Sequence, residues 1–221
     1  MTAWAVERSV GPAADHHRRP LPDPVERAVW ARAVDRPALV LGSTQPDGLV
    51  DAAAVAAAGV DLVRRHSGGG AVLLHPGGQL WLDVLVPAGD DLWRDDVGAA
   101  FHWLGETWAG ALAELGVDAQ VHHGPMERSA WSGLICYAGR GPGEVFVDGA
   151  KVVGIAQRRT RAGARFQCAA LLEPWDPAPV LDFLDLDPED RRRGAVELTA
   201  AARGLELPAG AVLDAFVAHL P

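Results

Sequence analysis

The chain has 221 residues and a mass of 23.3 kDa, and 49% of its residues are apolar, which is enough for one well-packed domain. Its 29 acidic and 20 basic residues give a net charge of −9, which argues against binding to nucleic-acid backbones. No apolar stretch is long enough for a membrane-spanning helix or a signal peptide, and two cysteines are too few for a disulfide framework. We therefore expect a cytoplasmic protein with free thiols and neither a nucleic-acid nor a membrane partner.

Lysine is nearly absent from the chain. Nineteen of the twenty basic residues are arginine, and Lys151 is the only lysine. The two residue types are not interchangeable, because an amine can lose its proton inside a protein whereas a guanidinium stays charged. Either Lys151 is a stray residue in an arginine-biased chain, or its position requires an amine.

The first part of the chain predicts an arm followed by alternating strands and helices. Residues 1–24, rich in proline and charge, are expected to form an N-terminal arm with weak structural preference, and residues 25–221 a single domain. Residues 25–34 predict a short helix, and Asp51 can cap an alanine-rich helix that ends at Gly59. Apolar or alternating runs predict strands over 38–44, 60–65, 71–74 and 79–86.

The second part predicts one long helix, a hairpin and a helical end. The helix spans Leu92–Leu115 with apolar residues on one face, and a loop over 124–143 follows a short strand at 119–123. Asp148-Gly149 between two β-rich runs is typical of a hairpin turn. The remaining expected elements are strands at 144–147, 151–159 and 166–172 and helices near 179–184, 188–203 and 208–220. This order predicts an α+β fold, a single domain with a mostly antiparallel central sheet flanked by helices.

The segment VRRHSGGGAV, residues 63–72, is the most unusual in the chain. Three consecutive glycines let a backbone approach a ligand closely and point several N–H groups inward, as an anion cradle requires. Arg64 and Arg65 would place positive charge at its entrance. The alternative is a tight glycine-rich connection, and the spacing matches neither a Walker loop nor a dinucleotide fingerprint.

A second motif, GAKVVGIAQRR, covers residues 149–159. Lys151 follows the hairpin turn by one residue, so the turn fixes its position. The apolar neighbours Val152 and Val153 indicate partial desolvation of its amine, whereas the alternative is an exposed hairpin lysine.

Together these two motifs resemble the lipoate–protein ligase and octanoyltransferase family, whose catalytic domain is similar to that of biotin ligases. The resemblance runs from about Ala38 to Leu172. It implies that the glycine loop lines an acyl pocket and that Lys151 contacts the acyl carbonyl or an acyl-adenylate. An ammonium there would stabilise developing charge, and a neutral amine could act as a base. The implied substrate-binding residues are Arg64, Arg65, Ser67, Gly68, Gly69, Gly70, Ala71, His75, Gly154, Ala156 and Gln157.

The family contains two chemistries that attach lipoate or octanoate to a carrier lysine. Ligases use ATP and Mg to form an acyl-adenylate, whereas transferases take octanoate from acyl carrier protein through a cysteine thioester and need no cofactor. Cys136 lies in the loop before the hairpin, where one transferase branch has its nucleophile. The segment 69–80 resembles a transferase pattern that includes His75, and only short helices follow Leu172 where bacterial ligases carry an accessory domain. The resemblance thus favours transfer through Cys136, with ATP-dependent ligation as the alternative.

One segment departs from the family. Members usually carry His-Gly in the strand after the lysine hairpin, and this chain has Gln167-Cys168-Ala169 there. Cys168 is a rival thiol, but its apolar strand predicts that it faces the core, which is the usual place of a free cysteine. Because of this departure, the alternative that the protein is a non-catalytic member of the family that only binds acyl groups stays open.

The implied partners are a lipoyl carrier domain, of a dehydrogenase E2 or a glycine cleavage H protein, and acyl carrier protein. The one basic cluster of the acidic chain is a candidate contact for an acidic carrier or a nucleotide phosphate, and its alternative is a solvated hairpin face. It consists of Arg158, Arg159, Arg161 and Arg165. The histidine pairs at 16–17 and 122–123 lack the spacing of a metal site, so no metal is expected.

Overall fold

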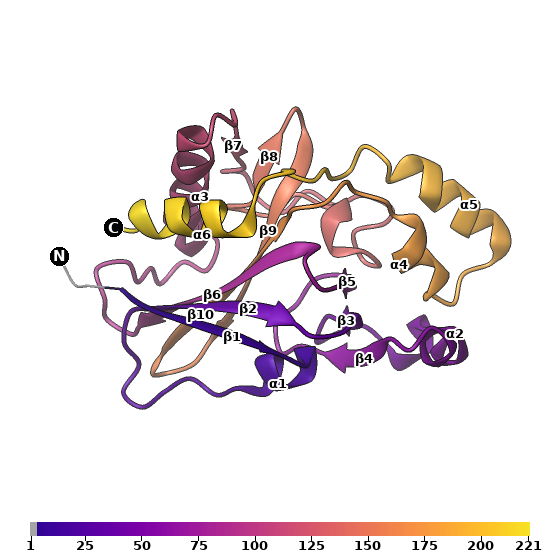
Figure 1. Cartoon of the computed structure of the whole chain (residues 1–221), viewed down its shortest axis with the longest axis horizontal. Helices are drawn as coiled ribbons and strands as arrows, with labels where there is room; N and C mark the ends of the chain where they lie inside the picture. The colour runs from indigo at the N-terminus through magenta and orange to yellow at the C-terminus, as the bar shows by residue number, and fades with distance from the viewer. Residues whose placement is uncertain (1–3) are drawn as a thin grey trace.

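The computed structural model describes residues 4–221, which form two sheets surrounded by helices (Figure 1). The larger sheet has the strand order β1-β2-β6-β10-β9-β8-β7, and the smaller has the order β4-β3-β5. The strands of the larger sheet, in that order, are Ala5–Gly11, Ala28–Val34, Gln79–Pro87, Gly163–Leu171, Ala150–Arg159, Val145–Val147 and Gln120–Val121. Those of the smaller are Asp61–Arg64, Ala38–Leu41 and Val72–Leu74.

The α+β fold is confirmed, with one correction to the sheet. From β2 onward, the successive strands β2, β6, β10, β9, β8 and β7 pair antiparallel with one another. The pairs β1–β2 and β3–β4 are parallel, so each sheet is mixed.

Within residues 4–221, six α-helices lie around the sheets, and two groups of them cover different regions (Figure 1). In chain order their bounds are α1 Ala13–Arg18, α2 Ala52–Ala57, α3 His102–Glu114, α4 Ala178–Asp182, α5 Pro188–Glu197 and α6 Ala209–Ala218. Helices α3 and α6 pack together against the larger sheet, whereas α4 and α5 lie beside the smaller one. No helix within residues 4–221 combines the length and apolar character needed to cross a membrane.

The N-terminal predictions are wrong for residues 5–34. The segment expected to have weak structural preference forms β1 and α1, and the expected helix over residues 25–34 is strand β2. β2 lies between β1 and β6, and six of its seven residues are buried. A strand buried on both faces shows no polar alternation, so its apolar residues can fit a helical period equally well.

The long predicted helix begins ten residues later than expected. Residues 92–98 form turns, and α3 starts at His102 after a short 3₁₀ turn. Asp90 accepts a hydrogen bond from the Leu92 N–H at 2.9 Å, and Asp96 accepts one from the Ala99 N–H at 2.7 Å. Aspartate side chains that bond nearby backbone groups compete with helical hydrogen bonds, which accounts for the late start.

Two local predictions are confirmed in detail. Asp51 caps α2 by accepting a hydrogen bond from the Ala54 N–H at 3.0 Å. Asp148 and Gly149 have φ values of 51° and 82°, the pair of left-handed residues that a tight hairpin turn requires. This turn fixes the start of β9 and therefore the position of Lys151.

The two faces of the larger sheet have different surroundings. One face packs with α3 and α6 into the main core, where the rings of Trp108 and Phe216 lie 4.5 Å apart. Part of the other face turns toward the smaller sheet, where Trp81 of β6 packs with Val40 of β3. The candidate site lies between the two sheets.

Candidate active site

The glycine loop and the Cys136 loop run side by side. Ala71 and Ile135 form a parallel bridge, in which the Ala71 N–H donates to the Leu134 carbonyl at 2.7 Å and the Cys136 N–H to the Ala71 carbonyl at 3.0 Å. A Cβ on Gly70 would lie 2.6 Å from the Cys136 nitrogen and closer still to the Ile135 carbonyl carbon. Only glycine fits there, and its absent side chain lets the two loops meet.

Arg65 organises the interior of the glycine loop. Its guanidinium is buried and donates to the carbonyls of Gly68 and Gly70, each at 2.8 Å. Arg64 donates to the carbonyls of Gly42 and Gln45 at 2.8 and 2.6 Å. Contrary to expectation, both guanidinium groups thus hold backbone carbonyls rather than present free charge at the loop entrance.

Lys151 is buried, which excludes an exposed hairpin lysine. Its side chain is 1% exposed, and Nζ lies 2.6 Å from Oε2 of Glu144, which is itself 7% exposed. Nζ also donates to the Cys136 carbonyl at 3.1 Å. Burial raises the pKa of the Glu144 carboxyl, and the charge and hydrogen bond of Lys151 oppose that shift. The lysine therefore links the hairpin to the backbone of the Cys136 loop.

A mainly apolar pocket opens in front of this ion pair, between the two sheets. Gly154 lies in its wall, and a Cβ built there would be 3.7 Å from Glu144 Oε1 and 3.9 Å from Lys151 Cδ. Lys151 itself does not line the pocket. The lining residues are His17, Val40, Arg65, Val72, Leu74, Trp81, Cys136, Tyr137, Gly154, Ile155, Ala156, Gln167, Cys168 and Ala169. Cys136, Arg65, Gly154 and Ala156, all predicted site residues, thus meet in one pocket.

Other predicted residues lie away from the pocket. His75 lines a separate cavity, where its Nε2 is 3.7 Å from Glu173 Oε2. Arg158 is exposed, whereas Arg159 stacks on the Trp93 ring at 4.2 Å and donates to the Asp95 carbonyl at 3.1 Å. Gln157 lies one residue beyond the pocket-lining part of β9, and its side-chain amide has no hydrogen-bond partner within residues 4–221.

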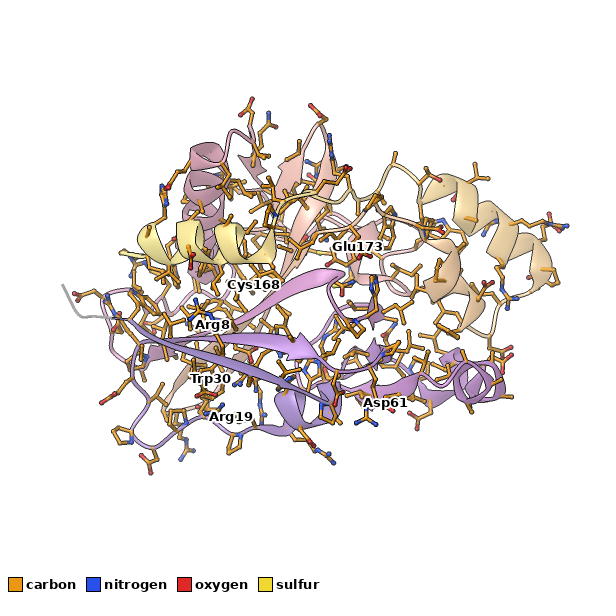
Figure 2. All side chains as sticks on the ribbon, in the orientation of Figure 1. Arg8, Arg19, Trp30, Asp61, Cys168 and Glu173 are labelled. Atoms are coloured by element: carbon orange, nitrogen blue, oxygen red, sulfur yellow. The ribbon has the colours of Figure 1, made fainter. Side chains whose placement is uncertain are left out.

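The two cysteines have different environments. Cys136 is partly exposed, whereas Cys168, labelled in Figure 2, is fully buried in the main core, as predicted. Burial raises the pKa of the Cys168 thiol to about 12, so this thiol stays protonated at neutral pH. Both cysteines line the pocket, but Cys136 is the one that is also exposed to solvent.

Sequence reasoning missed the polar partners of the site. Ser67 is buried and donates to Gln167 Oε1 at 2.8 Å, and Gln167 contacts Asp83 and His17. Glu144 was assigned only to a strand. Glu144 is an acidic residue directly before the hairpin that carries the only lysine, and this proximity is the signal that could have identified it. Nothing in the sequence places His17 near Gln167.

The family is identified by a sequence model described as the lipoyl protein ligase A/B catalytic domain, which matches residues 4–206. The chain belongs to this family. It is an enzyme of the acyltransferase or ligase type, and the resemblance of its two motifs is confirmed.

Relatives of known name agree with this assignment. The octanoyltransferase LipM of Kyrpidia tusciae is 30% identical over 197 residues, which are 87% of this chain and 69% of the relative. Two solved structures share the fold. A bipartite lipoate protein ligase from Thermoplasma acidophilum has a TM-score of 0.77 at 18% identity, over 99% of this chain and 82% of the other. A lipoate-protein ligase A bound with ATP has a TM-score of 0.69 at 18% identity, and the match covers 98% of this chain and 83% of the other.

Proposed function

We propose that this enzyme transfers an octanoyl or lipoyl group to a lysine of a lipoyl carrier domain through a thioester on Cys136. The observation that carries the proposal is the pairing of the glycine loop with the Cys136 loop, which sets a partly exposed thiol in the wall of an apolar pocket. A pocket with apolar walls suits an alkyl chain. The 30% identity to an octanoyltransferase supports the same route.

In the first half-reaction, the Cys136 sulfur attacks the carbonyl carbon of an octanoyl thioester on acyl carrier protein. A new carbon–sulfur bond forms, the bond to the donor sulfur breaks, and the donor thiol leaves with the proton that Cys136 gives up. In the second half-reaction, the amine of the carrier lysine attacks the Cys136 thioester. The amide forms, the carbon–sulfur bond breaks, and the proton lost by the amine returns to the thiolate.

We further propose that Lys151 assists both halves from behind the pocket wall, because its side chain lies next to Gly154, which lines the pocket, although Lys151 itself does not. Its ammonium has three N–H donors, of which Glu144 and the Cys136 carbonyl take two. We assign the third to the substrate carbonyl oxygen, where negative charge develops beside the attacking sulfur. Glu144 is a positioning residue in this scheme, because it holds the ammonium without touching the substrate.

ATP-dependent ligation is the second candidate, favoured by the fold shared with an ATP-bound lipoate-protein ligase A. It would require ATP with Mg and would leave the Cys136 thiol without a chemical role. The geometry of the glycine loop favours transfer instead, because Arg64 and Arg65 already donate to backbone carbonyls and have fewer N–H groups left for a triphosphate.

The carriers follow from the same proposal. The donor is acyl carrier protein, and the acceptor is a lipoyl domain of a dehydrogenase E2 or a glycine cleavage H protein. Arg158 at the exposed β9–β10 hairpin is a candidate contact for an acidic carrier, whereas Arg159 is held by Trp93.

Intact-protein mass spectrometry tests the route. After mixing with octanoyl–acyl carrier protein, the wild type is expected to gain one octanoyl group that hydroxylamine removes. Cys136→Ala should gain none, and the matched variant Cys168→Ala should still gain it, because the Cys168 thiol, although it lies at the pocket wall, is buried and protonated. An unmodified wild type that instead releases AMP from ATP and lipoate would contradict transfer and support ligation.

A further inference from the structure

One polar group of the pocket has no hydrogen-bond partner in the described part of the chain. His17 of α1 is 6% exposed, lines the pocket, and lies against the Trp81 ring with centroids 4.4 Å apart. Its Nδ1 faces the Gln167 amide nitrogen at 3.2 Å, but its buried Nε2 has no hydrogen-bond partner among residues 4–221. Buried polar atoms are rarely left unpaired, so this nitrogen requires an explanation.

The hydrogen bonds around Gln167 fix the orientation of its amide. Asp83 is fully buried and pairs with Arg165 at 2.6 Å, so its ionised carboxylate can only accept hydrogen bonds. The atom of Gln167 that faces Asp83 Oδ1 at 3.4 Å is therefore the NH₂ group. The same NH₂ group donates to His17 Nδ1, and Oε1 accepts from the Ser67 hydroxyl at 2.8 Å.

This orientation also fixes the tautomer of His17. Burial, together with the positive charges of the nearby Arg165 and Arg65, lowers the pKa of His17 to about 3, so the ring is neutral at pH 7. A neutral imidazole that accepts at Nδ1 carries its proton on Nε2. His17, which lines a pocket that otherwise suits an alkyl chain, thus carries an N–H donor with no acceptor among residues 4–221.

We propose that His17 Nε2–H donates a hydrogen bond to the bound acyl group, so that the pocket prefers an acyl chain bearing an acceptor atom over a plain saturated chain. The acceptor is an oxygen substituent or, more weakly, a dithiolane sulfur, because sulfur is the poorer acceptor. This inference rests on the proposed acyl-binding function and adds a specificity-determining residue to it. It does not depend on whether the acyl group is passed through Cys136.

Binding of free acids tests the preference. Titration calorimetry would give Kd for octanoic acid, for lipoic acid, and for octanoic acids hydroxylated at C6, C7 or C8. Wild type is expected to bind lipoic acid and at least one hydroxy acid more tightly than octanoic acid. In His17→Phe that preference should fall roughly 3- to 10-fold, the effect of one lost hydrogen bond. His17→Gln, which keeps an N–H donor, should retain part of it.

A neighbouring residue supplies the matched control. His16 is equally buried, but its Nε2 bonds the Ala33 carbonyl at 3.0 Å and the residue does not line the pocket, so His16→Gln should keep the wild-type preference. If His17→Phe does not fold, His17→Met removes the donor with less change in shape. Equal preference in wild type and in a donor-less variant overturns the proposal, as does failure of wild type to bind any acid. The Kd ratios are measured with free acids and do not depend on a thioester at Cys136. A failure of the transfer route would therefore appear only in the mass-spectrometry experiment and not in these ratios.

Discussion

At the scale of single residues, the central feature is a buried ion pair between Lys151 and Glu144. Such a pair contributes little net stability, because desolvation of both charges offsets their attraction. Removing one partner is costly, because the remaining charge is then buried alone. Stability and activity should therefore respond differently to changes at this pair.

The first prediction concerns stability. Lys151→Met should lower the free energy of unfolding by about 3–5 kcal/mol, because it leaves the Glu144 carboxyl buried without its counter-charge. The double variant Lys151→Met/Glu144→Leu should recover most of that loss. Urea unfolding of the three proteins measures both values, and a double variant no more stable than the single one would contradict this account.

The second prediction concerns activity. Lys151→Arg keeps the positive charge, but a planar guanidinium cannot place its donors as the compact ammonium does between Glu144 and the Cys136 carbonyl. We expect octanoyl transfer to the carrier to slow by about 100-fold, the cost of one lost oxyanion donor. The rate is measured on a variant shown by circular dichroism to be folded. Near-normal activity would mean that charge alone suffices at this position.

At the scale of elements, contact between two loops builds the site, and this contact depends on Gly70. The third prediction is that Gly70→Ala pushes the Cys136 loop away and costs about 1–3 kcal/mol of stability, together with most of the Cys136 acylation rate. Gly68→Ala is the matched control, since its Cβ meets nothing within 4 Å. Equal acylation rates in the two variants would show that the loop contact does not position the thiol.

The sequence allowed some elements to be predicted because their signals are local. The Asp148-Gly149 turn and the Asp51 cap depend on a few neighbouring residues, and both form as expected. Strand β2 was missed because its pairing with β1 and β6 is a tertiary effect that overrides the local pattern. For the same reason the sequence did not reveal that His17 meets Gln167, 150 positions away. The Glu144–Lys151 pair, by contrast, spans a single hairpin, and its signal is local.

At the scale of the whole molecule, pH should act through buried groups such as His17. Its pKa is 6.5 ordinarily and about 3 in the folded protein. Above pH 6.5 the ring is neutral in both states and contributes no pH dependence. Below that value the unfolded chain takes up a proton that the folded ring does not, so stability falls as the pH drops from 6.5 toward 3.

The fourth prediction follows from this difference. Between pH 7 and pH 5, the wild type should lose about 2 kcal/mol more stability than His17→Gln, in which the titrating ring is absent. Urea unfolding of both proteins at the two pH values gives the comparison, in which contributions from other groups largely cancel. Parallel losses in the two proteins would mean that His17 is protonated in the folded state.

The burial of the only lysine has a consequence for the surface of the molecule. An enzyme that carries an activated acyl group risks losing it to any nearby amine, and lysine side chains are the usual amines of a protein surface. Here every other basic residue is arginine, and Lys151 is 1% exposed and engaged with Glu144. The surface therefore offers no lysine that could be acylated by mistake, and under the proposed function the acceptor lysine is supplied by the carrier.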